Sequence, residues 1–365
     1  FYQHDTGPAD RPVVLTETDG GIGMVIPDYA PKCQEWWAQA YELHLNTVLM
    51  HHEIIRDDYP IEPYVSVGWQ IGMSDYGVRQ KNTDPEVEAG QRGAYHIDKA
   101  IEDLERDFHL LQPRTYSVNK EASLAQKALL EEVFEGVLGV RMRGNPWWTM
   151  GLTNPAIRLI GLEELMVYMF DQPEALHKLM KFLSDDNLRL LDWMASEGLL
   201  NINNEDDYVG SGSRGYTKSL PGAGFDGAVR TQDMWTLIES QETVGVGPRQ
   251  YEEFIFPYEN AIAERFGAVY YGCCEPAHPF WDDISALPHL KKVSISRWCD
   301  ERFMGEALRG SDIVYSRKPD PNFFAVDVTL DEERWAAHIR ETLQAARGVA
   351  IEANLDKGRG AVATV

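Results

Sequence analysis

Residues 268–278 read Ala-Val-Tyr-Tyr-Gly-Cys-Cys-Glu-Pro-Ala-His, a short apolar run followed by a turn that carries thiol, carboxylate and imidazole groups. The β-branched and aromatic residues at 268–271 predict a buried strand, and a helix is expected to follow over 277–287. A strand that ends in a polar turn and leads into a helix is the repeating unit of proteins built on parallel sheets. The chain on either side of this stretch repeats the unit.

The second half of the chain alternates predicted strands with predicted helices. Strands are expected at 199–202, 242–246, 268–271, 292–295, 313–315 and 349–352, and helices at 248–265, 277–287, 301–308 and 331–346. Upstream, the apolar spacing predicts helices at 34–56, 96–108, 121–136, 155–170 and 173–197, strands at 64–68 and 140–143, and a loop or lid at 70–95. Such alternation implies parallel strands with right-handed crossovers. A closed (β/α)8 barrel and an open doubly wound α/β sheet both fit, and no Gly-x-Gly-x-x-Gly follows a strand to support a dinucleotide site.

The composition is that of an acidic globular protein. The 365 residues carry a formal net charge of −24, and their 44% hydrophobic content is sufficient for a large core. Without a basic stripe to neutralise phosphates, a nucleic-acid partner is not expected, and an anionic membrane surface is disfavoured. No apolar run reaches membrane-spanning length, and the four cysteines do not resemble a secreted disulfide framework, so we expect a cytoplasmic protein.

Polar and ionisable residues follow five of the predicted strands. These polar turns begin at Asn203, Gly272, Ser296, Ser316 and Glu352. In a parallel barrel, catalytic groups come from the carboxyl ends of the strands. We therefore expect the five turns to converge on one polar mouth that binds a small-molecule substrate.

The Cys273-Cys274-Glu275 turn, with His278 just after it, is the centre of the predicted mouth. Thiolate, carboxylate and imidazole groups are the ligands of zinc, and a catalytic zinc keeps three protein ligands and one open position. Cys273, Glu275 and His278 would supply the three, with Cys274 as a substitute, and Cys273 is also a candidate catalytic residue. In the structural alternative, Cys274 packs as a small hydrophobic residue and His278 caps the next helix.

Three consecutive acids, Glu205, Asp206 and Asp207, follow the predicted strand at 199–202. At a barrel mouth such carboxylates act as general acids or bases, and crowding raises the pKa of one of them. We therefore take all three as catalytic candidates and the neighbouring Asn204 as a substrate-binding residue. The alternative is a solvated acidic turn.

Two cations and three aromatic residues complete the predicted substrate site. Arg317 and Lys318 are suited to bind a carboxylate or phosphate, unless they pair with nearby aspartates. Trp147 and Trp148 would form an aromatic wall for a planar ligand, or belong to ordinary core. Tyr216, in the glycine-rich connection over 209–225, is grouped with these substrate-binding candidates.

Five stretches of the chain carry a family resemblance: Ile-Gly-Leu-Glu-Glu-Leu-Met at 160–166, Gln-Pro-Glu-Ala-Leu-His at 172–177, Pro-Arg-Gln-Tyr-Glu-Glu-Phe-Ile-Phe-Pro at 248–257, Tyr-Gly-Cys-Cys-Glu at 271–275 and Ser-Arg-Lys-Pro at 316–319. With these stretches, the chain resembles the uroporphyrinogen decarboxylase superfamily from about residue 56 to the C-terminus. This resemblance implies a single (β/α)8 barrel of this type over 61–365, with an N-terminal extension and long helix over 1–60 that pack on it. The same resemblance implies a homodimer.

The resemblance also implies two broad activities, the decarboxylation of porphyrinogen acetates without a cofactor and a methyl transfer that involves a corrinoid protein. We rank the methyl transfer first. In that branch, an enzyme takes a methyl group from a small methylated donor and passes it to a corrinoid protein, and a His-x-Cys motif with a later cysteine binds zinc. Here Tyr271 stands in the place of the histidine and no cysteine follows Cys299, so a zinc ion would need the Cys273 turn instead. An aryl methyl ether donor, giving O-demethylation, fits the aromatic residues near the mouth, with the corrinoid supplied by a partner protein.

Two alternatives stay open at this point. A decarboxylase of a small acid or porphyrinogen, which is a lyase, would use Asp206 or Asp207 to protonate a carbanion and Arg317 to hold a carboxylate. The chain lacks an N-terminal arginine-rich segment to grip many carboxylates, and its negative charge disfavours a highly anionic substrate. The other alternative is a non-catalytic barrel that binds a tetrapyrrole or corrinoid partner. The five polar strand ends argue against it, because a site that only binds has no need of so many acidic residues.

Overall fold

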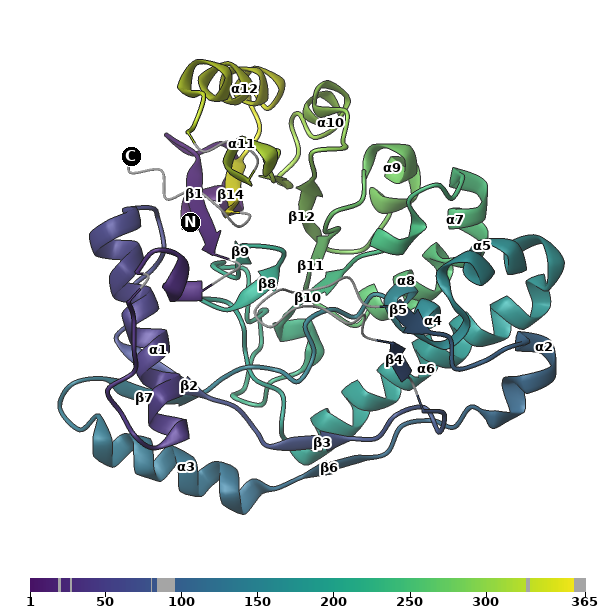
Figure 1. Ribbon diagram of the computed structural model, residues 1–365, viewed down its shortest axis with the longest axis horizontal. Helices are drawn as coiled ribbons and strands as arrows, with labels where there is room; N and C mark the ends of the chain where they lie inside the picture. The colour runs from purple at the N-terminus through teal and green to yellow at the C-terminus, as the bar shows by residue number, and fades with distance from the viewer. Residues whose placement is uncertain (19–20, 27, 80, 84–95, 326–328, 358–365) are drawn as a thin grey trace.

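The computed structural model describes residues 1–18, 21–26, 28–79, 81–83, 96–325 and 329–357. Its centre is a curled sheet of six parallel strands (Figure 1), in the order β1-β14-β13-β12-β11-β10. The strands are β1 (Val13–Thr18), β10 (Trp235–Ile238), β11 (Ala268–Tyr271), β12 (Leu290–Ile295), β13 (Val314–Arg317) and β14 (Ile351–Lys357). The protein is therefore an α/β protein with a half-barrel of parallel strands at its centre.

The remaining strands form pairs. β2 (Tyr64–Val67) and β7 (Gly139–Met142) make a separate parallel sheet. The antiparallel pairs are β3 (Ile71–Met73) with β6 (Tyr116–Val118), β4 (Lys81–Thr83) with β5 (His96–Asp98), and β8 (Tyr208–Gly210) with β9 (Ser213–Arg214). In the part of the chain that the structure describes, the parallel strands thus form a curled sheet and a separate pair, not one hydrogen-bonded ring of eight.

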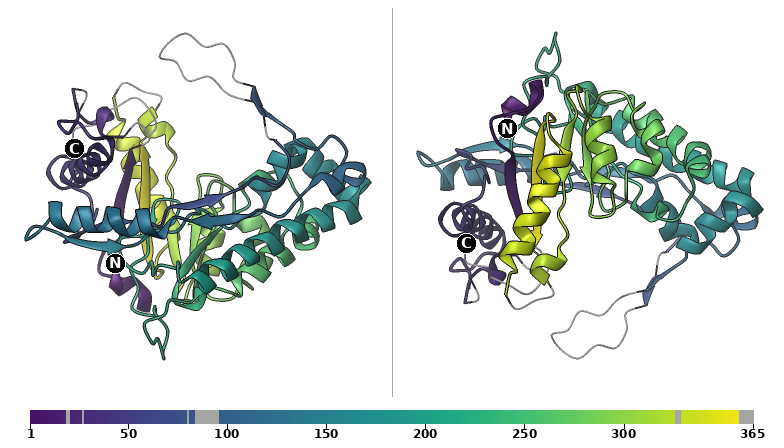
Figure 2. Two further views of the ribbon diagram at one scale, coloured as in Figure 1. Left: turned by 90° about the horizontal axis from the view of Figure 1, so that it is seen from below. Right: turned by 90° about the horizontal axis from the view of Figure 1, so that it is seen from above.

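Helices lie over the outer side of the curled sheet and beside the β2–β7 pair (Figures 1 and 2). They are α1 (Trp36–Met50), α2 (Leu104–Asp107), α3 (Lys120–Val133), α4 (Thr153–Ile160), α5 (Leu162–Asp171), α6 (Pro173–Glu197), α7 (Pro248–Phe254), α8 (Phe256–Ala263), α9 (Trp281–Ile284), α10 (Glu301–Ala307), α11 (Asn322–Ala325) and α12 (Glu332–Ala345). Among the described residues, none of these helices combines the length and the hydropathy needed to cross a membrane.

Alternate residues along the strands of the curled sheet face two different environments. The outer face carries apolar side chains that belong to the main core with the surrounding helices, including Ile238, Val269, Tyr271, Val293, Ile295 and Tyr315. The inner face carries a smaller apolar cluster and a set of buried polar groups, including Trp235, Leu237, Tyr270, Lys292, Ser294, Ser316 and Glu352. This division follows from the two-residue period of a strand, and it decides which side chains reach the concave side.

The β8–β9 hairpin lies against the inner face of the sheet. Lys292 Nζ donates to Ser213 Oγ at 2.8 Å and to the Arg214 carbonyl at 2.9 Å, and it pairs with Glu352 at 3.0 Å. Gly210 packs so closely on Tyr270 that a Cβ atom at this position would lie 2.3 Å from the ring. The hairpin therefore fills the concave side of the sheet, where a closed barrel has its interior.

Two of the predicted strands are wrong. Residues 242–246 form no strand, and β10 lies seven residues earlier, where the buried Trp235–Ile238 run pairs with β11. The β-branched residues Thr243 and Val244 suggested the wrong segment. Residues 199–202 are extended but unpaired, because the Asn203 side chain bonds both backbone groups of Trp235, accepting at 2.8 Å and donating at 3.0 Å. An amide side chain thus replaces the expected strand pairing.

Other elements agree with the prediction in part. The strand at 268–271 and the helix at 173–197 have the predicted bounds. The helix predicted at 155–170 is divided into α4 and α5 at Gly161, whose φ of 94° breaks a helix. The helix predicted at 96–108 is wrong for its first half, which contains β5. Of the loop or lid predicted at 70–95, residues 84–95 lie outside the described residues.

Strand β1 was not predicted. It lies within the segment 1–60 that was expected to form an extension, and it pairs with β14 over six residues, from Val13 with Glu352 to Thr18 with Lys357. Part of the predicted extension is therefore a strand of the central sheet. Alternating threonine and acidic residues at 16–18 hide the strand from a search for apolar runs.

The contact between Gly210 and Tyr270 generates a stability prediction. Gly210→Ala should lower the free energy of unfolding by about 1–3 kcal/mol, because the added methyl group overlaps the buried ring. Gly222→Ala is the matched control, since its Cβ would meet nothing closer than Asp233 Oδ1 at 3.9 Å. Urea unfolding of both variants measures the difference, and equal stabilities would contradict the tight packing of the hairpin on β11.

Candidate active site

The carboxyl ends of β10 to β13 gather a set of polar groups on the inner side. Lys318 Nζ and Ser294 Oγ both donate to the Cys273 carbonyl, at 2.8 and 2.7 Å. Gly272, with a φ of 92°, turns the chain out of β11 so that this carbonyl faces both donors. Glu239 follows β10 directly, on the same face as Trp235 and Leu237. We call Glu239, Cys273, Ser294 and Lys318 the mouth cluster.

Glu239 is fully buried and is the one carboxylic acid of the mouth cluster. Desolvation, reinforced by the nearby Glu275 and Glu242, raises the pKa of Glu239 to about 8. Its Oε2 accepts a hydrogen bond from the Gln241 backbone at 3.1 Å, and its Oε1 has no partner among the described residues. Glu239 is therefore a largely uncharged carboxylic acid at neutral pH, with a proton to donate.

Two further buried acids support the turn next to Glu239. Glu275 accepts from the backbone amides of Ser240 and Cys273, both at 2.9 Å, and so joins the ends of β10 and β11. Glu259, on α8, accepts from Ser240 Oγ at 2.8 Å, and burial raises its pKa well above the usual range. Both side chains are bound by the protein itself, which leaves Glu239 as the acid with a free oxygen.

The four predicted zinc ligands are not brought together. Cys273 Sγ lies 3.6 Å from Cys274 Sγ and 3.4 Å from Ser211 Oγ, but Glu275 is engaged by backbone amides. His278 Nδ1 instead accepts from the Asp300 backbone at 3.2 Å. Across the described ranges, no three His, Cys, Asp or Glu side chains form a group that could hold a metal ion. The residues present therefore do not fit a zinc site.

The Cys273 sulfur is a thiol at neutral pH. Its contact with Cys274, together with burial, raises the pKa of Cys273 above its ordinary value. Lys318 acts in the opposite direction but does not reverse the shift. Cys273 is thus placed in the predicted mouth, but without the thiolate character that metal binding or nucleophilic attack requires.

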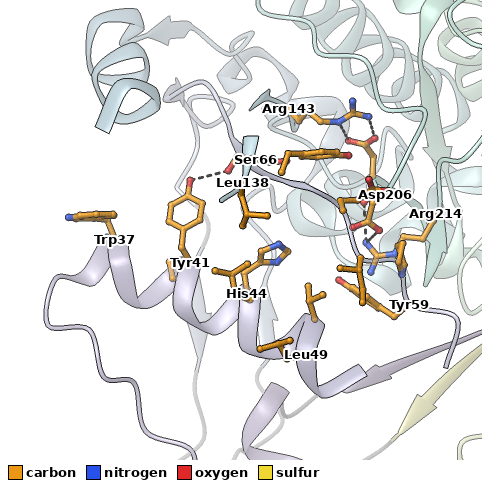
Figure 3. Close-up of a pocket in the computed structure, with 18 of the residues that line it drawn as sticks. Trp37, Tyr41, His44, Leu49, Tyr59, Ser66, Leu138, Arg143, Asp206 and Arg214 are labelled. Atoms are coloured by element: carbon orange, nitrogen blue, oxygen red, sulfur yellow. Dashed lines mark hydrogen bonds and ion pairs between the residues drawn. The ribbon is translucent and has the colours of Figure 1, made fainter. Parts of the chain in front are cut away.

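Two of the three predicted acids, Asp206 and Asp207, line a second place between α1 and the β2–β7 sheet, where Figure 3 shows Asp206, and Glu205 lies next to them in the chain. Asp207 pairs with Arg143, the residue after β7, and Glu205 accepts from Tyr64 and Arg141. Desolvation raises the pKa of Asp206 to about 7. The sequence correctly indicated a perturbed acid here, but the cause is burial more than crowding.

Arg317 and Lys318 point to opposite sides of β13. Arg317 faces outward, where its guanidinium nitrogens bond to the carbonyls of residues 295, 296 and 318 and to side chains on α10 and α12. It has no nitrogen left for a substrate carboxylate. Lys318 faces inward and belongs to the mouth cluster.

The remaining substrate-binding candidates are dispersed. Asn204 donates to the Leu220 carbonyl at 2.8 Å, and Trp147 packs on the main core. Tyr216 bonds to Glu62 and stacks near Phe1, with ring centroids 4.6 Å apart. Trp148 is 47% exposed and lies near Tyr208 of the hairpin. Of these four, Trp148 is the exposed side chain, and the other three are half-buried.

Sequence reasoning missed Glu239, Arg214 and Lys292 as members of polar sites. Glu239 would have been found if the strand had been placed at 235–238, because it is then the first residue after a strand. Glu352 was expected at a strand end, but it lies inside β14 and pairs with Lys292. No pattern in the sequence indicates that Lys292 and Glu352 are partners.

No protein-family model and no curated protein sequence matches this chain. Among solved structures, a methyltransferase from Methanosarcina mazei is similar, with a TM-score of 0.51 and 13% sequence identity. The similarity covers 99% of this chain and 92% of that one. At this identity it shows a shared fold, a barrel-like arrangement of parallel strands and helices, over nearly the whole length. The resemblance to the uroporphyrinogen decarboxylase superfamily stays a prediction.

The raised pKa of Glu239 predicts how stability depends on pH. The folded protein holds this proton up to about pH 8, whereas the unfolded chain releases it near 4.5, so stability falls as the pH rises between these values. The free energy of unfolding of the wild type, relative to Glu239→Gln, should fall by on the order of 2 kcal/mol from pH 6 to pH 8.

Urea unfolding at a series of pH values measures this difference. Glu132→Gln, at an exposed position on α3, is the control and should follow the wild type at every pH. If the free energy of unfolding changed with pH in the same way for the wild type and for Glu239→Gln, Glu239 would not be a neutral, buried acid.

Proposed function

We propose that the protein is a methyltransferase that removes a methyl group from an oxygen atom of a small donor, such as an aryl methyl ether, with a corrinoid protein as the acceptor. The observation that carries the proposal is Glu239, a buried carboxylic acid that keeps its proton at neutral pH at the inner end of a strand. The fold likeness to a methyltransferase gives further support.

The proton on Glu239 is what an oxygen-bound methyl donor needs. When the carbon–oxygen bond breaks, its electron pair stays on the oxygen, and the Glu239 carboxyl donates its proton to that oxygen to give a neutral hydroxyl product. The methyl group leaves to the acceptor, whose corrinoid would supply the nucleophilic electron pair when bound. A donor with a quaternary nitrogen leaves as a neutral amine and needs no such proton.

Lys318 and Trp148 would assist this step. The Lys318 ammonium, held 2.8 Å from the Cys273 carbonyl, stabilises negative charge that develops on the leaving oxygen. The partly exposed indole of Trp148 offers an apolar face for an aromatic donor.

The decarboxylase alternative is less well supported. Arg317, the residue assigned to hold the carboxylate, has its guanidinium engaged by protein groups on the outer side of the sheet. A neutral Glu239 would protonate a carbanion as well as an oxygen, so the proton donor alone does not distinguish the two reactions. Release of carbon dioxide is the measurement that separates them.

The proposal predicts a dependence on Glu239 in a methyl-transfer assay. The purified protein is incubated with reduced corrinoid and separate donors: an aryl methyl ether, methanol, a methylamine and a quaternary methylammonium compound. We expect methylated corrinoid and demethylated product from the oxygen donors, and a decrease of about a hundredfold or more in that rate for Glu239→Gln. The wild-type rate should fall as the pH rises through about 8.

Glu132→Gln controls for a general effect of removing an acid and should leave the rate unchanged. Turnover of the quaternary donor alone, at the same rate in Glu239→Gln, would contradict the role of the proton. Release of carbon dioxide from small acids with no methyl transfer from any donor would favour the decarboxylase.

A further inference from the structure

A groove separate from the mouth cluster lies between α1 and the β2–β7 sheet (Figure 3). It encloses about 700 Å³, a volume typical of sites for small organic molecules. One wall is the apolar side of α1, including Trp37, Tyr41, Leu45 and Val48. The polar end is formed by Tyr59, Arg143, Asp206, Asp207 and Arg214.

Most charged groups at the polar end are engaged by one another. Arg143 donates to Asp207 and lies 3.3 Å from Glu205, which also accepts from Tyr64 at 3.0 Å. Glu62, at the edge of the groove, accepts from Tyr216. These groups hold the walls in place and have little capacity left for a ligand.

Arg214 and Asp206 also pair with each other, but this pair leaves part of their hydrogen-bonding capacity unused. Their Nη1 and Oδ1 atoms are 3.3 Å apart, yet Arg214 Nε and Asp206 Oδ1 are both buried without a hydrogen-bond partner among the described residues. Figure 3 shows both side chains at the polar end, across the groove from α1. Two buried polar atoms that lack hydrogen bonds cost free energy, which a ligand would recover.

We propose that this groove binds an apolar carboxylic acid, whose carboxylate lies between Arg214 and Asp206 and whose body lies along α1. Arg214 Nε donates to one carboxylate oxygen, and the protonated Asp206 carboxyl donates to the other. The aliphatic and aromatic side chains of α1 suit either a hydrocarbon chain or an aromatic ring. The groove contains neither Glu239 nor Cys273, so this inference stands apart from the proposed methyl transfer.

Binding through a protonated Asp206 makes the affinity depend on pH. Burial places the pKa of Asp206 near 7, so the carboxyl is mostly protonated at pH 6 and mostly ionised at pH 8.5. An ionised Asp206 repels the bound carboxylate, and the dissociation constant should therefore rise through this range. The charged and titratable groups that line the groove with Asp206 come from every element around it: Tyr41 and His44 on α1, Tyr59 and Glu62 before β2, Tyr64 on β2, Arg143, Asp207 and Arg214.

Calorimetric titration with decanoate, 2-naphthoate and decan-1-ol tests the proposal. Decanoate represents an aliphatic acid, 2-naphthoate an aromatic acid, and decan-1-ol the apolar body without its charge. We expect at least one acid to bind more tightly than the alcohol, and its dissociation constant to be about tenfold higher at pH 8.5 than at pH 6.

Matched variants assign the binding to the groove. Arg214→Met should weaken acid binding about tenfold or more, whereas Arg141→Met should not, because Arg141 lies over Tyr64 outside the groove. Asp206→Asn should keep the affinity measured at pH 6 and lose the pH dependence. Ala40→Trp fills the groove from an exposed position on α1 and should abolish binding without disturbing buried charges.

Three results would overturn the proposal. The first is equal affinity for decanoate and decan-1-ol, and the second is equal weakening by Arg214→Met and Arg141→Met. The third is that neither acid binds to a protein whose circular dichroism shows it folded. If Arg214→Met does not fold, Ala40→Trp and Asp206→Asn decide the outcome, and unchanged binding in Ala40→Trp places the acid elsewhere.

Discussion

The buried Lys292 ammonium is the interaction on which the inner side of this protein depends. Its nitrogen has three partners, which belong to β14 and to the β8–β9 hairpin. A buried charge is tolerated only when it is paired and its hydrogen bonds are satisfied, and Lys292 meets both conditions. Burial acts to raise the pKa of Glu352, but Lys292 and the hydroxyls of Ser213 and Ser316 hold it below its usual range. One ion pair thus joins two strands and the hairpin at a single relative position.

The hairpin in turn contributes to both polar regions of the molecule. Ser211, at its tip, contacts the Cys273 thiol of the mouth cluster. Arg214, three residues later, lies at the polar end of the groove beside α1. Because Gly210 and Gly212 bring the backbone against Tyr270 and Asn354, the hairpin has little freedom to shift. The two regions are therefore held at a fixed distance from each other by one short, tightly packed segment.

The sequence predicted those helices and strands whose apolar residues follow a regular period. It did not predict which side chains meet when contacts join distant segments of the chain. β11 and α6 were found with their bounds because their apolar residues follow the period of a strand and of a helix. Arg317 and Lys318 are adjacent in a strand and must face opposite sides, but the sequence does not say which faces inward. The predicted zinc ligands were grouped because they are close in sequence. In the structure, however, Glu275 accepts a hydrogen bond from the Ser240 backbone amide and His278 accepts one from the Asp300 backbone amide. The pairing of Asp207 with Arg143 joins two distant turns and has no local signal.

The pairing of β1 with β14 has a consequence for how the chain folds during synthesis. Val13 pairs with Glu352, so one edge of the central sheet joins segments from opposite ends of the described chain. The ribosome releases β1 long before β14 exists, and the contact carries the full loop-closure entropy of the chain between them. Until then, β1 has an exposed hydrogen-bonding edge on the side that β14 later occupies, a feature that favours association with other chains. The acidic residues in and around β1 and the strongly negative charge of the whole chain counter that association while translation is completed.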